Sequence, residues 1–177
     1  MTLMDRLFRL GEFTGALTIA EYFIHVHSNT KFTSALAECH SIKGRISQMN
    51  EEYNVALSHF EIASKLVSNQ TSVLFGLGQM YTYQADFDKA IESYQALLVN
   101  DSQNYETLKR LASIYSNRPG MKQQAIECFD RLLVLLKSCN DLDKKSENIS
   151  DPEIFIEYAQ LIEDTDVKSS LNCSFNF

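Results

Sequence analysis

Proline and long apolar runs are scarce in this chain, and each scarcity narrows what the protein can be. Pro119 and Pro152 are the only prolines among 177 residues, so a missing amide hydrogen interrupts a helix at few places. No apolar run reaches membrane-spanning length, and the first residues lack the apolar stretch of a secretory leader. We therefore predict a soluble, intracellular helical protein that has no membrane partner.

Basic residues are also in the minority. The chain has 16 lysine and arginine residues against 23 aspartate and glutamate residues, which gives a formal net charge of −7 at pH 7. This balance disfavours direct binding of nucleic acid, because contacts to phosphates require a basic surface. No cluster of lysine and arginine that would serve as a nuclear-localisation signal occurs in the sequence.

The cysteines lack the spacing of a metal site or a disulfide framework. Cys39, Cys128, Cys139 and Cys173 include no C-x-x-C pair, so free and mostly buried thiols in a reducing compartment are expected. Cys39 lies next to His40, but no further ligand follows at zinc spacing. We predict no bound metal.

No set of residues has the pattern of a catalytic or cofactor site. His25 and His27 are two positions apart, and on a helix such residues point about 200° away from each other. Gly76 and Gly78 lack the third glycine and the preceding strand of a phosphate-binding loop. No Ser-His-Asp or Cys-His combination is singled out by its spacing. We predict that the chain is not an enzyme and needs no cofactor.

A repeat with a period of 34 residues is the strongest pattern that the chain does contain. Gly44, for example, recurs 34 residues later as Gly78. The clearest copy combines Leu-Gly-x-x-Tyr at 77–81 with Ala-x-x-x-Tyr at 90–94. A fixed period of this length with these two motifs is the signature of the tetratricopeptide repeat, in which each repeat is a pair of antiparallel helices.

Small and aromatic residues recur where the helices of such pairs would cross. Small side chains let two helices approach closely, and aromatic rings fill the space beside the contact. After the clearest copy, the pattern continues with a shift of one residue. We predict that the repeats are packed by Gly44, Ala56, Phe60, Gly78, Tyr81, Ala90, Tyr94, Ala112, Tyr115, Ala125 and Phe129.

The apolar periodicity predicts an all-α fold, a tetratricopeptide-repeat solenoid of antiparallel helix pairs. Helices are expected near 3–10, 12–27, 32–48, 53–67, 71–83, 87–99, 105–117, 121–138 and 152–164. The predicted domains are an incomplete N-terminal repeat at 1–30, three repeats within 31–139 (about 37–70, 71–104 and 105–139), an exposed loop at 140–151, the first helix of a further repeat at 152–166 and a divergent tail at 167–177. The chain is expected to begin and end within a longer array.

The surface most suited to binding is the concave face that the first helix of each repeat lines. In the general repeat pattern, five positions of that helix point into the groove. We predict that the partner-binding groove is formed by Arg45, Met49, Phe75, Gln79, Tyr83 and Lys109, with Glu38, Ser41, Gln48, Ser72, Thr82, Glu106, Ser113, Ser116 and Asn117 beside them. Phe75 and Tyr83 are the expected apolar anchors, because aromatic residues carry much of the binding energy at interfaces.

Several stretches resemble one family of tetratricopeptide proteins more closely than the general pattern. They are Phe-Gly-Leu-Gly-Gln-Met-Tyr at 75–81, Asn-Tyr-Glu-Thr-Leu-Lys at 104–109, Glu-Tyr-Ala-Gln-Leu-Ile-Glu at 157–163, and the helix at 51–63. These stretches are similar to the tetratricopeptide scaffold subunits of the RNA polymerase II-associated factor complex. The resemblance runs in order over residues 5–166.

This resemblance implies a nuclear scaffold of a transcription elongation complex, one that couples the passage of the polymerase to histone ubiquitination and methylation. The implied partners are the other subunits of that complex and, indirectly, RNA polymerase II. Members of the family are much longer and carry many more repeats and a charged tail. The chain departs from the repeat pattern at Lys43, Ser47 and Ser102, and from the family beyond Lys168.

A second function class remains open from the sequence, that of a co-chaperone adaptor that binds the acidic tails of heat-shock proteins. Such adaptors resemble one another in a clamp of lysine and asparagine at fixed positions of the first helices. Here those positions carry Ser41, Arg45, Phe75 and Gln79, so the clamp is absent. A transferase built on a repeat scaffold would need a catalytic domain that this sequence does not contain.

Overall fold

The chain folds into two separate groups of helices. The computed structural model describes residues 2–27, 32–142, 152 and 154–163. It divides the chain into two compact units: unit 1 spans Met1–Ser102 and unit 2 spans Gln103–Phe177. Within the described residues all regular secondary structure is helical, which confirms the predicted all-α class.

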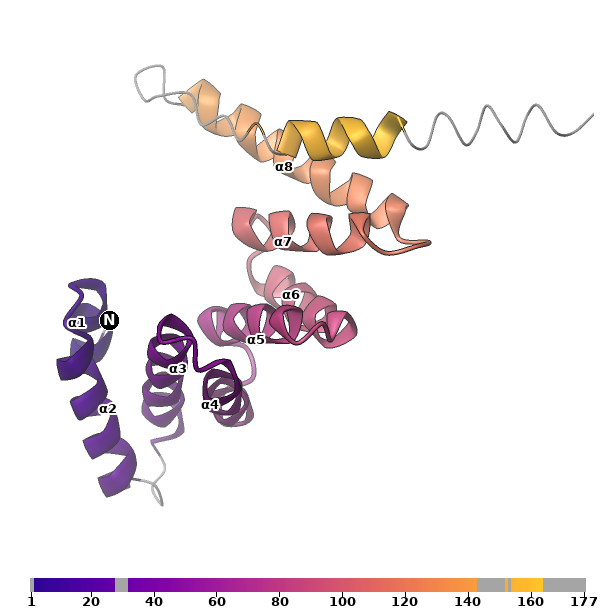
Figure 1. Cartoon of the computed structure of the whole chain (residues 1–177). Helices are drawn as coiled ribbons and strands as arrows, with labels where there is room; N and C mark the ends of the chain where they lie inside the picture. The colour runs from indigo at the N-terminus through magenta and orange to yellow at the C-terminus, as the bar shows by residue number, and fades with distance from the viewer. Residues whose placement is uncertain (1, 28–31, 143–151, 153, 164–177) are drawn as a thin grey trace, which may run out of the picture. The chain divides into compact units, whose positions relative to one another are not determined.

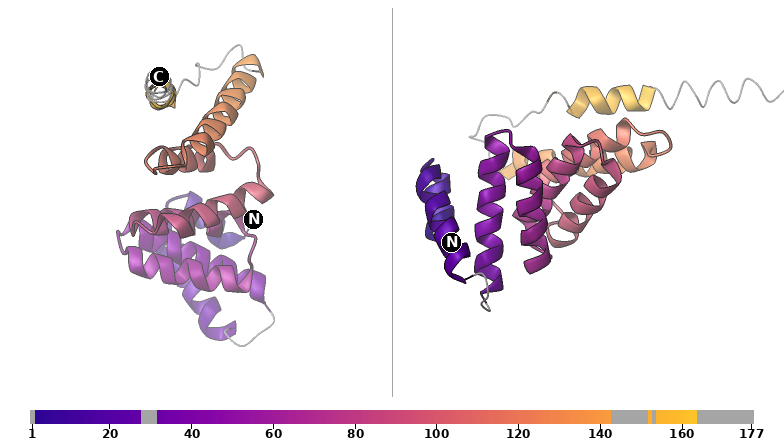
Figure 2. Two further views of the ribbon diagram at one scale, coloured as in Figure 1. Left: turned by 90° about the vertical axis from the view of Figure 1, so that its right-hand side faces the viewer. Right: turned by 60° about the horizontal axis from the view of Figure 1, so that its bottom comes forward.

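Unit 1 is built from three helix pairs in chain order. The pairs are α1 (Leu3–Arg9) with α2 (Phe13–His27), α3 (Thr33–Met49) with α4 (Tyr53–Leu66), and α5 (Thr71–Tyr83) with α6 (Phe87–Asn100). Each helix packs against the next one in the chain (Figure 1, Figure 2). The first helices of the pairs also contact one another, α1 with α3 and α3 with α5, so they form one side of the unit.

The three pairs share the same turn between their helices. Gly11, Glu51 and Ala85 each adopt a left-handed backbone, with φ of 80°, 63° and 58°. In each turn the residue after this one donates its backbone amide to a carbonyl five residues earlier, at 2.8–2.9 Å. This is the Schellman geometry that ends a helix and reverses the chain. The shared turn shows that α1 and α2 form a pair of the same kind as the later two.

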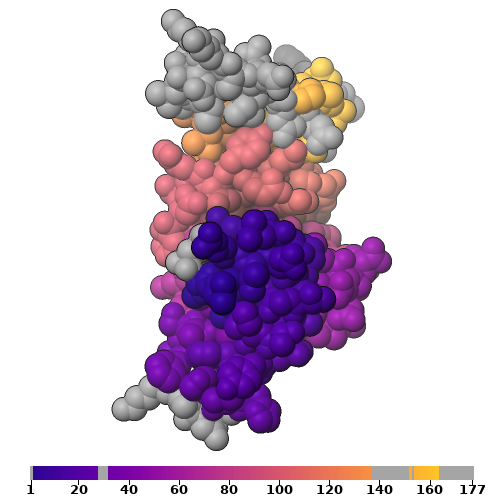
Figure 3. All heavy atoms as spheres, turned by 90° about the vertical axis from the view of Figure 1, so that its left-hand side faces the viewer, coloured from indigo at the N-terminus to yellow at the C-terminus, as the bar shows by residue number. Residues whose placement is uncertain are grey.

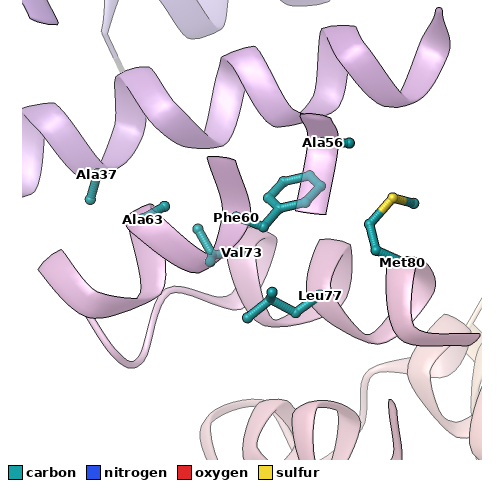
Figure 4. Packing of buried hydrophobic residues seen from close by; sticks show 7 residues of the cluster. All are labelled: Ala37, Ala56, Phe60, Ala63, Val73, Leu77 and Met80. Atoms are coloured by element: carbon teal, nitrogen blue, oxygen red, sulfur yellow. The ribbon is translucent and has the colours of Figure 1, made fainter. Parts of the chain in front are cut away.

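Two apolar clusters join the first five helices of unit 1. The first surrounds the fully buried ring of Phe60 and joins α3, α4 and α5 (Figure 4); it contains Ala37, Ala56, Phe60, Ala63, Val73, Leu77 and Met80. The second joins α1, α2 and α3 and contains Met4, Ala16, Ala20, Cys39, Ile42 and Ile46. The atoms of α1 and α2, coloured indigo, cover one face of the unit (Figure 3). Burial of these side chains is the main favourable term in folding.

Glycines let the aromatic rings approach the helix backbones. A Cβ atom placed on Gly76 would lie 2.5 Å from Cζ of Phe60, and one placed on Gly44 would lie 2.9 Å from Cε1 of the same ring. In the next pair, a Cβ on Gly78 would lie 2.4 Å from Cε1 of Tyr94. All three positions therefore need glycine for space.

Unit 2 contains α7 (Tyr105–Ser116), α8 (Lys122–Leu142) and a further helical segment at 154–163. The side chain of Asn104 caps α7 by accepting hydrogen bonds from the amide of Thr107 at 3.0 Å and from its hydroxyl at 2.7 Å. The segment at 154–163 packs against α8, where the hydroxyl of Tyr158 donates to Oδ1 of Asp130 at 2.7 Å.

The predicted packing residues lie in the interior of the two units. All of them are buried except Tyr81, which is half-buried and donates its hydroxyl to Oε1 of Glu61 at 3.1 Å. One prediction needs correction: α8 continues to Leu142, so the first three residues of the predicted loop at 140–151 are helical. The apolar periodicity weakens after Leu136, so the end of this helix was predicted too early in the chain. The rest of that loop and the predicted tail at 167–177 lie outside the described residues.

Candidate partner-binding groove

A cavity of about 590 Å³ lies against the first helices of unit 1. Its walls come from α1, α3 and α5, with a contribution from α4 and from the residue before α5. We call this cavity the unit-1 groove; it is lined by Asp5, Arg9, Glu38, Ser41, Ile42, Arg45, Gln48, Phe60, Gln70, Ser72, Phe75, Gly76 and Gln79.

Neutral hydrogen-bonding side chains meet across the groove from α3 and α5. Nε2 of Gln48 donates to Oε1 of Gln79 at 3.1 Å, and the hydroxyls of Ser41 and Ser72 lie 3.4 Å apart. A side-chain amide offers two donors and two acceptor lone pairs, so one bond uses only part of its capacity. These contacts orient the amides and leave donors and acceptors for a ligand.

The charged residues of the groove pair with one another or with α1. A carboxylate oxygen of Asp5 forms an ion pair with Nε of Arg9 at 3.2 Å, and the other lies 3.8 Å from a terminal nitrogen of Arg45. The guanidinium of Arg45 also lies over the ring of Phe8, 3.8 Å from its centroid. Burial lowers the pKa of Arg45, and the negative charge of Asp5 opposes this shift. Glu38 accepts a hydrogen bond from the hydroxyl of Thr2.

The structure brings together half of the predicted groove residues. Arg45, Phe75 and Gln79 line the same cavity. Met49 and Tyr83 are exposed at the ends of α3 and α5 and are not part of its lining; the ring of Tyr83 instead stacks on Tyr53, with centroids 3.8 Å apart. Lys109 belongs to α7 in unit 2, so it is not part of the unit-1 groove.

The predicted groove did not include six of the lining residues: Ile42, Phe60, Gln70, Gly76, Asp5 and Arg9. Of these six, only Asp5 and Arg9 are charged. The helix that carries them has only seven residues and lacks the Leu-Gly-x-x-Tyr motif, so the repeat pattern did not align it. The signal was the turn at Gly11. Counting back six residues from the left-handed turn residues at 11, 51 and 85 gives Asp5, Arg45 and Gln79, one from each first helix.

Unit 2 has a smaller cavity at the corresponding place. It measures about 480 Å³ and lies between α7 and the helical segment at 154–163. Three predicted groove positions, two in α7 and one at its C-cap, take part in it; the lining comprises Ser113, Ser116, Asn117, Lys122, Glu157, Gln160 and Leu161. First helices therefore line a polar cavity in each unit.

Two histidines face each other between α3 and α4, outside the groove. Nδ1 of His40 lies 3.1 Å from Nδ1 of His59, so one ring donates a hydrogen bond to the other. Burial lowers the pKa of His59 to about 4, and the nearby charges of Lys43 and His40 add to the shift. The pKa of His40 is lowered too, first by burial and then by Lys43. Lys43 itself pairs with Glu21 at 3.3 Å.

We expect acid to destabilise unit 1 through this histidine pair. The unfolded chain takes up protons near the ordinary histidine pKa of about 6.5, whereas the folded chain resists protonation down to about pH 4. The free energy of unfolding should therefore fall by about 1–2 kcal/mol between pH 7 and pH 5. Chemical denaturation at the two pH values measures the change.

The matched variants are His59→Gln, which should remove most of the pH dependence, and His25→Gln, which alters an exposed histidine of α2 and should retain it. An equal pH dependence in both variants would mean that carboxylates, not the histidine pair, cause the loss.

Other chemistries find little support in the part of the chain that the structure describes. No group of three or more histidine, cysteine, aspartate or glutamate side chains is placed to hold a metal ion there. Burial raises the pKa of Cys39 and of Cys128 to about 11, so both thiols stay protonated at neutral pH. None of the described helices is long and apolar enough to cross a membrane.

The arrangement defines a protein of the helix-pair repeat class, in which successive antiparallel pairs present their first helices as a binding surface. The chain contains a tetratricopeptide repeat: the family model described as "Tetratricopeptide repeat" matches residues 73–104, which hold most of α5 and all of α6. Tetratricopeptide repeats build protein-interaction scaffolds.

Solved structures of MamA share the fold. One crystal structure of MamA is 19% identical, with a TM-score of 0.62 over 84% of this chain and 76% of that one. A MamA RS-1 double mutant is 16% identical, with a TM-score of 0.61 over 93% of each chain. Another MamA crystal structure is 18% identical, with a TM-score of 0.56 over 80% of this chain and 98% of that one. At these identities the likeness establishes the fold alone.

Proposed function

We propose that this chain holds an extended segment of a partner protein in the unit-1 groove, as part of the scaffold of a transcription elongation complex associated with RNA polymerase II. The observation that carries the binding role is the groove itself, where Arg45, Phe75 and Gln79 converge from two first helices. Tetratricopeptide arrays use such surfaces to bind other proteins. The proposed partners are the other subunits of the complex and, indirectly, the polymerase.

The resemblance to the scaffold subunit known as the Cln-three-requiring protein nine supports the finer assignment. The stretch at 75–81 contributes both Phe75 and Gln79 to the groove. The stretch at 104–109 forms the cap and first turn of α7. A nuclear location and a link to histone modification follow from this resemblance and belong to the proposal.

A co-chaperone adaptor for acidic peptide tails is the competing candidate. Such an adaptor needs cations free to bind carboxylates, and Arg45 is the only groove cation at the clamp positions. Arg45 is already held between Asp5 and Phe8, so it is poorly placed to bind the carboxylate of an acidic tail. This contact therefore disfavours the adaptor.

Purification of the tagged chain from a nuclear extract, with mass spectrometry of the bound proteins, tests the proposal. Recovery of the other polymerase-associated factor subunits is the expected result. Recovery of heat-shock proteins without any of those subunits would contradict it and favour the adaptor.

We expect Ser72→Tyr to weaken binding of the recovered partner at least about ten-fold, because the new ring would fill the groove beside Phe75. Ser72 is exposed at the start of α5, so the larger side chain should leave the fold intact. Titration of the purified partner segment by calorimetry measures the effect.

Ser58→Tyr is the matched control for this experiment. It makes the same substitution at an exposed serine of α4, a second helix, where the side chain is not part of the groove lining. Equal loss of affinity in both variants would show that the partner binds elsewhere.

A further inference from the structure

Each first helix of unit 1 contributes one residue at an equivalent position of its helix pair. Asp5, Arg45 and Gln79 each lie six residues before the left-handed turn of their pair, and all three line the groove. These three residues form a row along the groove, with one negative, one positive and one neutral side chain. The negative charge stands beside the positive one, at 3.8 Å.

The charges within the groove cancel. Its lining contains two arginines, Arg9 and Arg45, and two carboxylates, Asp5 and Glu38. Arg9 is two-thirds exposed, at 67%, so water and salt screen it strongly. Arg45 is the less exposed cation, and Asp5, whose side chain is only 19% exposed, is its counter-ion.

An acidic ligand would have to compete with Asp5 for Arg45. If the guanidinium turned to an incoming carboxylate, Asp5 would keep only the exposed Arg9 as a counter-ion, while a second negative charge arrived beside it. Separating a partly desolvated ion pair is costly, and like charges in close contact add to the cost. The ring of Phe8 covers one face of the same guanidinium, which leaves fewer directions of approach.

The rest of the lining suits an uncharged chain. Its neutral donors and acceptors are the side chains of Ser41, Gln48, Gln70, Ser72 and Gln79. The backbone of an extended peptide presents amide and carbonyl groups, which such side chains bind. Phe75 and Ile42 supply apolar surface for a side chain of the bound segment.

We propose that the unit-1 groove selects uncharged extended segments, and that Asp5 is the residue that excludes acidic ones by occupying Arg45. This inference rests on the proposed binding role of the groove and names the chemistry of its partner. Asp5 acts as a specificity-determining residue, because its carboxylate sets the charge that a ligand meets.

Selection from random 12-residue peptides displayed on phage tests this inference with the full chain. Peptides selected by the native chain should lack aspartate and glutamate, and their affinity should change less than about two-fold between 50 and 500 mM salt. Peptides selected by Asp5→Asn should be enriched in acidic residues and should lose about ten-fold in affinity over the same range.

Two control variants distinguish the effect of the Asp5 charge from a general effect of substitution on folding. Asp5→Glu keeps the carboxylate and should select the same uncharged peptides as the native chain. Glu92→Gln removes one negative charge at an exposed position of α6 outside the groove, and it should do the same. Should Asp5→Asn fail to fold, Gln79→Lys adds a cation to the same row and should also admit acidic peptides.

Acidic peptides from the native chain, identical peptides from the native chain and Asp5→Asn, or no selected peptide at all would each overturn the inference. These outcomes are distinct from failure of the proposed function. If the nuclear extract yielded no polymerase-associated subunit, selection of uncharged peptides through the groove would still support the inference.

Discussion

Replacing Phe60 with alanine should lower the free energy of unfolding of unit 1 by about 3–5 kcal/mol. The ring is fully buried and lies against two backbones at once, at Gly44 in α3 and at Gly76 in α5. Its removal would leave a cavity where three helices meet, because helix backbones collapse poorly into such a space. Chemical denaturation at constant pH, followed by circular dichroism, measures the loss.

The control for this variant is Tyr22→Ala. Tyr22 is an aromatic residue of α2 whose surface is 69% exposed, so its loss should change the free energy of unfolding by less than about 0.5 kcal/mol. A similarly small effect for Phe60→Ala would mean that the ring does not join the first helices.

A double substitution tests the contact between Phe60 and Gly76 directly. Gly76→Ala by itself should destabilise the unit, because its Cβ would lie 2.5 Å from the ring. In the Phe60→Ala background the same change has room, so it should stabilise the unit by about 0.5–1 kcal/mol through helix propensity. Additive effects of the two substitutions would contradict the contact.

Gly78→Ala should have the second-largest effect, a loss of about 1–3 kcal/mol. Alanine is ordinarily the better residue inside a helix, by about 1 kcal/mol, so propensity alone predicts the opposite sign. We expect the steric clash to outweigh helix propensity, because the new Cβ would lie 2.4 Å from the fully buried ring of Tyr94. Thermal and chemical denaturation both measure the sign of the change in the free energy of unfolding.

Gly15→Ala provides the matched comparison in the same unit. Gly15 is also inside a helix, α2, but the nearest side-chain atom to its Cβ position is Cδ1 of Leu7 at an ordinary 3.7 Å. This variant should therefore gain about 0.5–1 kcal/mol. The prediction of opposite signs fails if Gly78→Ala also stabilises the chain.

Much of the fold followed from the sequence because the repeat fixes it locally. The spacing that joins Gly78 to Tyr94 places a small residue and a ring at fixed points of two helices linked by a short turn. Their contact therefore needs no knowledge of distant parts of the chain. The same holds for Gly44 and Phe60. Helix α1 was not aligned with the first helices of the repeats, because it is too short to show the periodicity. Its turn at Gly11 nevertheless repeats those at Glu51 and Ala85.

Contacts between successive helix pairs could not be derived in the same way. Gly76 lies two residues before the repeat glycine and meets Phe60 of the preceding pair. Which face of α5 turns toward that ring depends on the rotation between pairs, and the 34-residue period does not encode this rotation.

The sequence by itself determined that the chain is helical, that its helices come in pairs, and that the first helix of each pair lines a groove. Only the tertiary structure decided which residues share that groove. It placed Arg45, Phe75 and Gln79 together, with Met49 and Tyr83 at the helix ends. It also decided the charge of the groove, because Asp5 and Arg45 are forty positions apart in the chain and their charges cancel only once α1 packs against α3. Periodicity specifies the face of a helix, whereas the pairing of charges between helices depends on how those faces are packed.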